Sequence, residues 1–186
     1  AKAGTILVAL NWHGAADEVT AICDDSEAHT VIIHRDLIDT LRPALRGRRV
    51  IAVTPDAALR STYSITDAAA TAEPDFPEWD DLVAGHEPLT QPASMRPLRR
   101  YTSGSTGRPK GIRRISSGPR GDFTDALKRM GKEMMGFKPG SHFFTAAPVY
   151  HSAPSTLTSA ALVSEGVSTS IAPKFEPHSF LATIEA

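Results

Sequence analysis

The densest group of residues suited to binding an anion is the run YTSGSTGRPKGI at residues 101–112. Gly104 and Gly107 let the backbone approach a ligand closely, because a glycine tolerates positive φ. The backbone amides of such a loop can line an anion-binding concavity, to which Lys110 adds a full positive charge. The hydroxyl groups of the loop come from Thr102, Ser103, Ser105 and Thr106. The pattern therefore predicts a site for the phosphates of a nucleoside triphosphate.

Other interpretations of this loop agree less well with its residues. A Gly/Ser-rich run is often a flexible linker, but Pro109 stiffens this turn. A P-loop of the kinase and GTPase kind requires Gly-Lys-Ser/Thr, whereas Lys110 lies between Pro109 and Gly111. The chain also lacks the G-x-G-x-x-G fingerprint of a dinucleotide-binding fold. The phosphate-binding interpretation is therefore favoured.

Three segments carry a resemblance to a known family. The run TSGSTGRPKG resembles the phosphate-loop signature of the adenylate-forming (AMP-binding) superfamily, which includes acyl-CoA synthetases, luciferases and the adenylation domains of peptide synthetases. APVYHSAP at residues 147–154 resembles the segment that lines the acyl pocket in that family. LNWH at residues 10–13, followed by ADEV at 16–19 and DDS at 24–26, is similar to the acyl-CoA synthetase (fatty-acid-CoA ligase) branch in particular.

The resemblance implies a ligase that works in two steps. A carboxylate attacks the α-phosphate of ATP to give an acyl-adenylate and pyrophosphate, and the thiol of coenzyme A then displaces AMP. Lys110, Thr106 and a magnesium ion would offset the repulsion between these anions and stabilise the charge that moves onto pyrophosphate, so both residues are expected to be catalytic. The residues implied to hold the β- and γ-phosphates are Thr102, Ser103, Gly104, Ser105, Thr106, Gly107 and Lys110.

The acyl and thiol pocket is expected at Tyr150, His151 and Ser152. A histidine in such a setting is most often a hydrogen-bonded structural residue, but the resemblance implies that His151 borders the acid and the approach of the thiol. No second His, Cys or acidic residue stands at ligand spacing in this segment, so no metal ligands are predicted there. Fatty, aromatic and small carboxylic acids all remain open as substrates.

Some signatures of the family do not occur in the chain. We find no later Tyr-Gly-x-Thr-Glu segment, no ribose-binding aspartate motif and no C-terminal catalytic lysine. Arg99 and Arg100 also stand where an apolar strand would usually lead into the loop. Residues 1–186 are therefore expected to form a partial N-terminal, ATP- and acyl-binding domain, inactive on its own, without the later N-terminal portion and the C-terminal domain. The alternative is a non-catalytic phosphate-binding or interaction domain derived from the same family.

The elements expected to position these residues alternate in type along the chain. Such alternation predicts an α/β fold with a largely parallel sheet flanked by helices. Residues 68–97 are rich in proline and acids and read as mostly loop, and residues 1–4 as the end of a helix. Strands are predicted at residues 5–10, 30–34, 49–53, 142–146 and 167–172. Helices are predicted at residues 15–24, 36–45, 78–84, 122–135 and 155–164, with a last one opening at 175–180. Val19, Ile22 and Cys23 share one face of the first helix, and the helical spacing of Phe123, Leu127, Met130 and Met134 indicates core contacts for the helix at 122–135.

Length and composition bound the class of protein. With 186 residues and 41% hydrophobic content, the chain can bury one core. The single Cys23 is expected to be a small buried side chain, which fits a reducing compartment. No apolar run is long enough to span a bilayer, and no signal peptide is evident, so a cytoplasmic location is expected. Oligomeric state cannot be read from the sequence.

Charge is distributed unevenly although the formal net charge is only -1. Between Glu87 and Asp122 there is no acidic residue, and such a block attracts polyanions, including the phosphates of ATP and coenzyme A. The alternative, favoured for the individual arginines, is a solvated basic face paired with acidic residues elsewhere in the molecule. The near-neutral total and the scarcity of aromatic residues nearby argue against nucleic-acid binding. The basic residues of this block are Arg96, Arg99, Arg100, Arg108, Lys110, Arg113, Arg114 and Arg120.

Overall fold

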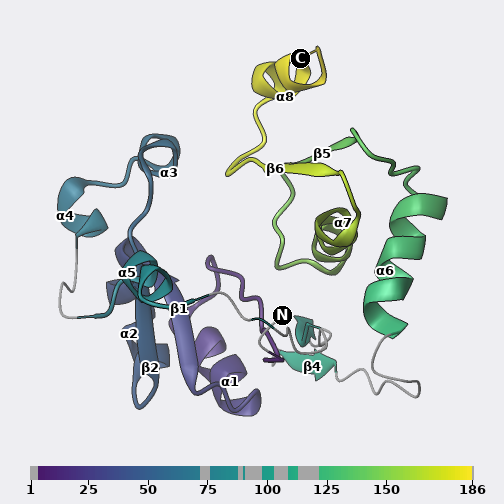
Figure 1. Ribbon diagram of the computed structural model, residues 1–186. Helices are drawn as coiled ribbons and strands as arrows, with labels where there is room; N and C mark the ends of the chain where they lie inside the picture. The colour runs from purple at the N-terminus through teal and green to yellow at the C-terminus, as the bar shows by residue number, and fades with distance from the viewer. Residues whose placement is uncertain are drawn as a thin grey trace. The chain divides into compact units, whose positions relative to one another are not determined.

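The computed structural model describes residues 4–71, 76–87, 90, 98–102, 109–112 and 122–185. Helices alternate with short strands, which confirms the α/β class (Figure 1). Among these described residues the strands form three two-stranded sheets, β1–β2, β3–β4 and β5–β6, and not one continuous sheet. The chain divides into two compact units: residues 10–90 with 101–113, and residues 1–9 with 91–100 and 114–186.

The first unit is built around a parallel pair of strands. Strand β1 (Thr30–His34) pairs in register with β2 (Arg49–Val53), and both bounds agree with the prediction. Helix α1 (Ala16–Asp25) precedes β1. A 3-10 turn, η1 (Arg35–Leu37), leads into helix α2 (Ile38–Leu45), so the helix predicted at 36–45 begins as a tighter turn.

The core of this unit forms because each element has one apolar face. Val19, Ile22 and Cys23 recur at helical spacing and are all buried, as the sequence predicts. The strands are rich in β-branched residues, which suit a pleated, half-buried surface. One continuous cluster joins α1, β1, α2 and β2, and its members are Val19, Cys23, Ile33, Ile38, Leu41, Ala44, Leu45, Val50 and Ala52.

Three short helices follow in the same unit: α3 (Ala57–Tyr63), α4 (Asp67–Ala70) and α5 (Trp79–Ala84). The helix predicted at 78–84 is confirmed as α5, whereas α3 and α4 are additions that the sequence did not predict. The structure describes every residue of α3, and none of them is buried. The helix therefore lacks the apolar periodicity that would predict it from the sequence. Its beginning is set by Asp56, whose carboxylate accepts a hydrogen bond from the Leu59 amide at 2.8 Å.

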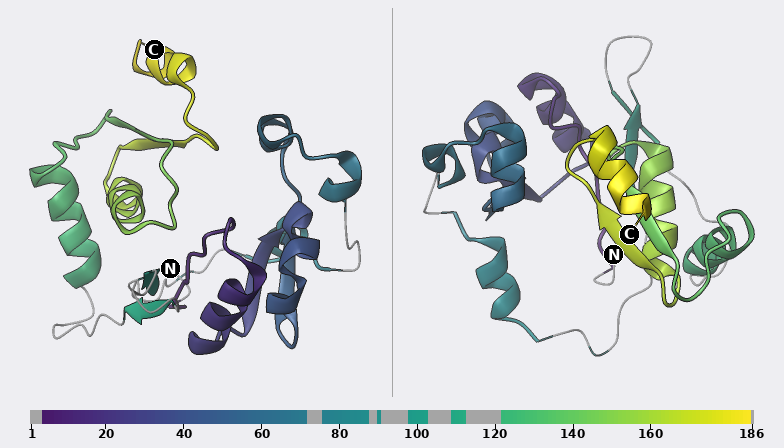
Figure 2. Two further views of the ribbon diagram at one scale, coloured as in Figure 1. Left: turned by 180° about the vertical axis from the view of Figure 1, so that it is seen from behind. Right: turned by 90° about the horizontal axis from the view of Figure 1, so that it is seen from above.

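The second unit contains helix α6 (Asp122–Glu133), strand β5 (His142–Thr145), helix α7 (Ser152–Val163), strand β6 (Ser168–Ile171) and helix α8 (Pro177–Glu185). Strands β5 and β6 are parallel and α7 is the crossover between them, packed on this sheet and on α6 (Figure 2). Gly131 permits the close approach of α6 and α7, since a Cβ there would lie 2.7 Å from Ser164 Oγ.

Several predicted elements are corrected by the structure. Residues 5–10 do not form a strand: Ile6 and Leu7 are exposed, and only Val8 makes a bridge, to Arg99. Helix α7 begins at Ser152 and not at 155, because proline is tolerated in the first turn, where amides have no partner within the helix. The helix predicted at 122–135 ends at Glu133, so Met134 is 77% exposed and not a core residue, whereas Leu127 is buried as expected. Residues 1–3 of the expected helix end lie outside the described residues.

Candidate functional site

The predicted phosphate loop is described at its two flanks. Strand β3 (Arg100–Thr102) ends at Thr102 and strand β4 (Lys110–Ile112) begins at Lys110, and the two strands are hydrogen-bonded to one another. Both Thr102 and Lys110 are exposed. Paired strands thus carry the loop, and two of its predicted phosphate ligands lie at the strand ends that border it. The other predicted ligands, Ser103, Gly104, Ser105, Thr106 and Gly107, lie outside the described residues.

The base of these two strands is packed around Tyr101. A Cβ built on Gly111 of β4 would lie 3.0 Å from Tyr101 Cζ and 3.1 Å from its hydroxyl oxygen. The Tyr101 hydroxyl donates a hydrogen bond to Asp25 Oδ2 at the end of α1. In the sequence, Tyr101 stands out only as the first residue of the run at 101–112 and Asp25 only as part of the DDS segment. The contact joins residues 76 positions apart, and no local pattern signals it.

The segment at residues 147–154 lies at the carboxyl end of β5. Thr145 Oγ1 accepts a hydrogen bond from the Ala147 amide at 3.2 Å, and the His151 amide donates to the Pro148 carbonyl at 3.1 Å. His151 is then the N-cap residue of α7. The turn therefore presents Tyr150, His151 and Ser152 at the start of a helix beyond a strand end, where ligands bind in open α/β sheets.

His151 is exposed and lies against its neighbour, with the ring centroids of Tyr150 and His151 4.5 Å apart at 51°. Within the described residues its side chain makes no capping hydrogen bond to α7. Ser152 is also exposed, and its carbonyl accepts a hydrogen bond from Thr156 Oγ1 at 2.8 Å. The three predicted pocket residues therefore form a short surface at the start of α7. A capping hydrogen bond to α7 does not explain why a histidine occupies position 151.

The arginines before the phosphate loop have defined contacts. Arg100 Nη2 donates a hydrogen bond to Thr156 Oγ1 at 2.7 Å, and both groups belong to the same unit. The Arg99 amide donates to the Leu7 carbonyl at 2.9 Å. Both arginines are half-buried, so the departure from an apolar strand is accommodated by polar contacts. Arg100 is thus held against the first turns of α7.

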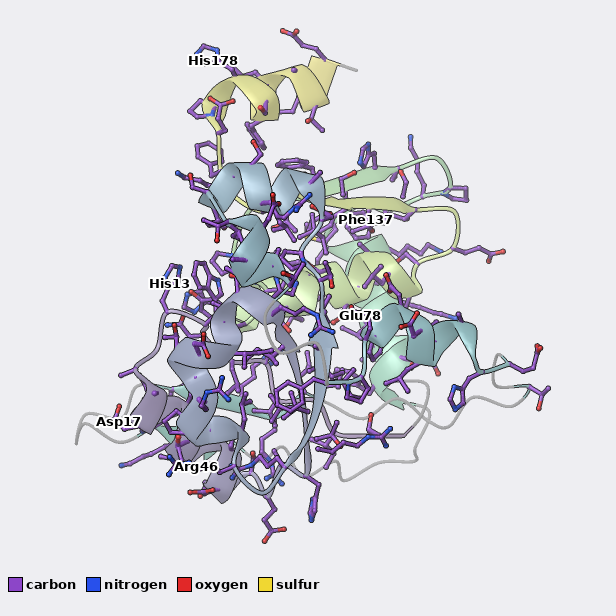
Figure 3. The ribbon with its side chains drawn as sticks, turned by 90° about the vertical axis from the view of Figure 1, so that its left-hand side faces the viewer. His13, Asp17, Arg46, Glu78, Phe137 and His178 are labelled. Atoms are coloured by element: carbon purple, nitrogen blue, oxygen red, sulfur yellow. The ribbon has the colours of Figure 1, made fainter. Side chains whose placement is uncertain are left out.

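The LNWH segment serves packing in this structure. His13 lies on the loop before α1 (Figure 3), and its amide donates to Asn11 Oδ1 at 3.1 Å. The rings of Trp12 and His13 are 3.5 Å apart, and Trp12 meets Tyr63 of α3 edge-on at 5.4 Å. These contacts hold the entrance of α1 against α3, which gives the segment a structural role.

A polar cluster closes the carboxyl ends of β1 and β2. Arg35 is 7% exposed and its Nη2 lies 2.9 Å from Glu78 Oε2, while Glu78 Oε1 accepts from the Thr54 amide at 2.9 Å. Burial raises the pKa of Glu78, but the hydrogen bonds from Thr54 and the Arg35 guanidinium outweigh it, so the pKa is lowered overall. Each charge has its partner here, which is typical of a structural ion pair.

Two further groups are structural. Cys23 is 2% exposed, and burial raises the pKa of its thiol, as expected for an inert core cysteine. Across the ranges that the structure describes, no group of three or more His, Cys, Asp or Glu residues could hold a metal ion. In the same ranges no helix is long and apolar enough to cross a membrane.

Comparison with known proteins adds the following. The family described as "AMP-binding enzyme" matches residues 1–186. A plipastatin synthase of Bacillus subtilis (strain 168) is 29% identical over 111 residues, which are 60% of this chain and 3% of that protein. The shared length is thus a small part of that large relative.

Solved structures resemble the whole chain. A putative long-chain-fatty-acid CoA ligase from Rhodopseudomonas palustris CGA009 is 20% identical with a TM-score of 0.66, over 100% of this chain and 42% of that one. A benzoate CoA ligase from Burkholderia xenovorans LB400 is 16% identical with a TM-score of 0.66, over 98% of this chain and 33% of that one. At these identities the likeness establishes the fold, and the chain spans less than half the length of either protein.

Proposed function

We propose, because the chain belongs to the AMP-binding enzyme family, that the whole protein is an ATP-dependent acyl-CoA synthetase. It would activate a carboxylic acid as the acyl-adenylate and pass the acyl group to coenzyme A. The observation that carries the proposal is the pair of strands β3 and β4, which present Thr102 and Lys110 at the two ends of a Ser/Thr/Gly-rich connection. This arrangement suits a polyphosphate better than an uncharged ligand.

The choice of coenzyme A as acceptor rests on the segments upstream of the phosphate loop. The LNWH, ADEV and DDS segments resemble the acyl-CoA synthetase branch. The solved structures described as a long-chain-fatty-acid CoA ligase and a benzoate CoA ligase are compatible with it, although luciferases share the same fold. A fatty or aromatic acid is therefore proposed as the substrate class.

In this proposal the chemistry is mainly electrostatic. A carboxylate must approach a triphosphate, and charge then moves onto the pyrophosphate leaving group. Lys110 and Thr106, with the loop hydroxyls and amides, would counter that charge where it develops. A magnesium ion on the nucleotide would neutralise further charge, although no group of three or more His, Cys, Asp or Glu residues among the described residues could hold it.

The second part of the proposed site is the surface at the start of α7. Tyr150, His151 and Ser152 would border the acyl group and the incoming thiol. His151 is exposed, so its ring is accessible to a ligand. Because a helix N-terminus carries partial positive charge, this position favours an anionic substrate group near Ser152.

The experiment replaces Lys110 with Ala in the full-length protein and measures ATP-dependent pyrophosphate release with a panel of carboxylic acids. We expect turnover to fall by about 10²- to 10³-fold, as when one donor that stabilises developing charge is removed. Lys128→Ala is the matched control, because Lys128 is exposed on α6. Unchanged turnover in Lys110→Ala would remove this lysine from the mechanism. ATP binding without any turnover by the wild-type protein would support the non-catalytic alternative.

A further inference from the structure

Tyr101 and Asp25 connect the base of the phosphate loop to the core of its own unit. Tyr101 is the middle residue of β3, one residue before the loop ligand Thr102. Its hydroxyl lies 2.5 Å from Asp25 Oδ2, on the last residue of α1. Both residues belong to the unit formed by residues 10–90 and 101–113. The hydrogen bond thus links a functional strand to a packed helix.

Gly111 fixes the ring of Tyr101 from the other strand. The nearest atoms to a Cβ at Gly111 would be Tyr101 Cζ at 3.0 Å, with Cε1 and the hydroxyl oxygen at 3.1 Å. Gly111 directly follows Lys110 in β4. The tyrosine ring therefore lies against Gly111 of β4, which follows the lysine proposed to bind phosphate, and its hydroxyl end is held by Asp25.

The carboxylate of Asp25 stands at an unusual place for a negative charge. Asp24 and Asp25 are the last two residues of α1, where the helix dipole disfavours acidic side chains. The structure gives each a separate partner. Asp24 forms an ion pair with Arg48, and Asp25 accepts the hydrogen bond from Tyr101. Two adjacent carboxylates at a helix C-terminus thus point to two separate contacts.

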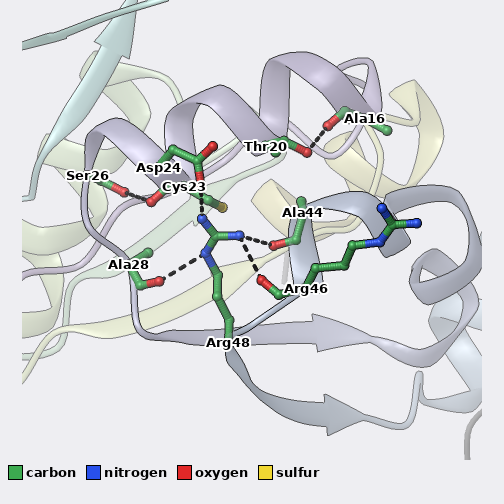
Figure 4. A network of polar contacts seen from close by, with 9 residues as sticks. All are labelled: Ala16, Thr20, Cys23, Asp24, Ser26, Ala28, Ala44, Arg46 and Arg48. Atoms are coloured by element: carbon green, nitrogen blue, oxygen red, sulfur yellow. Dashed lines mark hydrogen bonds and ion pairs between the residues drawn. The ribbon is translucent and has the colours of Figure 1, made fainter.

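Arg48 fixes the C-terminal end of α1 to neighbouring segments of the same unit (Figure 4). Its guanidinium donates hydrogen bonds to the carbonyl of Ala28 at 3.0 Å and to that of Ala44 at 2.9 Å, in addition to its ion pair with Asp24. The same residue therefore ties α1 to the turn before β1 and to the end of α2. Since Val19 and Cys23 of α1 are buried in the core, the helix end that carries Asp25 is held in place.

We propose that Tyr101 and Asp25 are a positioning pair that holds strands β3 and β4 on the end of helix α1 and thereby sets Thr102 and Lys110 for the phosphates of ATP. The proposal rests on the proposed function, because it concerns the same loop. Neither side chain contacts substrate directly. Both act through strands β3 and β4, which carry the phosphate ligands.

The pair predicts a pattern among variants. Tyr101→Phe keeps the ring against Gly111 but removes the donor, and Asp25→Ala removes the acceptor. Asp25→Asn keeps an oxygen that accepts from the tyrosine hydroxyl but lacks the negative charge, so its loss should be smaller than that of Asp25→Ala. Tyr63→Phe is the matched control, because it removes the same hydroxyl from a half-exposed tyrosine of the same unit.

The experiment measures KM for ATP, kcat for pyrophosphate release and the affinity for ATP by calorimetry in the full-length protein. We expect Tyr101→Phe and Asp25→Ala each to raise KM and the dissociation constant for ATP by about tenfold, the loss expected for one hydrogen bond to a charged group. The double variant should be no worse than the poorer single variant, since both remove one interaction. Asp25→Asn should lose less than Asp25→Ala, and Tyr63→Phe should stay within about twofold of the wild-type values.

The outcomes separate this inference from the proposed function. If Lys110→Ala loses ATP affinity and turnover while Tyr101→Phe and Asp25→Ala keep the wild-type values, the positioning pair is refuted and the function stands. If the two variants lower only the melting temperature, the contact is structural and the inference is also refuted. If the wild-type protein does not bind ATP, both proposals fail together.

Discussion

A single methyl group at Gly111 provides a direct test of how tightly the base of the phosphate loop is packed. In Gly111→Ala the new Cβ would lie 3.0 to 3.1 Å from three atoms of the Tyr101 side chain. Favourable carbon contacts lie at about 3.5–4.0 Å, so the ring must move by several tenths of an ångström. Its hydroxyl is held by Asp25, so that movement strains or breaks the hydrogen bond.

The expected magnitude follows from these contacts. Overpacking a closely packed site costs about 1–3 kcal/mol, and we expect the free energy of unfolding to fall by that amount at most, because Gly111 itself is exposed. Lys110 is its direct neighbour, so the displacement should also weaken ATP binding. We expect about a tenfold loss of affinity, of the size that follows from one lost hydrogen bond to a charged group.

The assay pairs urea unfolding with calorimetric titration of ATP into the full-length protein. Tyr101→Ala serves as the background control: without the ring, the three atoms nearest to the added methyl group are gone, so Gly111→Ala should cost much less there. This non-additivity is the signature of a direct contact. A Gly111→Ala protein with wild-type stability and ATP affinity would refute the packing argument, and so would an equal loss in both backgrounds.

Two further predictions concern the polar contacts that hold the first unit. Arg48→Ala should lower the free energy of unfolding by about 2–4 kcal/mol, because it removes an ion pair and three carbonyl hydrogen bonds at once. A thermal unfolding curve that matched that of the exposed variant Arg46→Ala would contradict this. Glu78→Gln should cost about 1–3 kcal/mol at neutral pH. Because the pKa of Glu78 is lowered in the folded protein, its charge stabilises the fold fully at pH values above its ordinary pKa of 4.5. This stabilisation is lost as the pH falls through the pKa of the folded state. Urea unfolding between pH 7 and pH 3 should therefore show a shallower acid dependence in Glu78→Gln than in the wild-type protein, and equal slopes would show that Glu78 does not contribute.

The sequence by itself was sufficient for elements whose burial pattern is local. Val19, Ile22 and Cys23 at helical spacing predicted the buried face of α1, and the β-branched runs predicted both strands of the parallel pair with their bounds. The family was likewise readable from TSGSTGRPKG, because a phosphate loop concentrates its hydroxyls, glycines and lysine within a few consecutive positions. The roles assigned to Lys110, Thr106 and His151 remain predictions.

Tertiary structure decided what depends on residues far apart in the chain. The run at 5–10 looks like a strand, yet only Val8 finds a partner, and a strand needs neighbours that its own residues cannot supply. Helix α3 has no buried face, so no apolar pattern in the sequence predicts it. Tyr101 meets Asp25, and Arg100 meets Thr156, across 76 and 56 positions. The sequence around a hydrogen-bonding group does not identify its distant partner, because only the fold brings the two groups together.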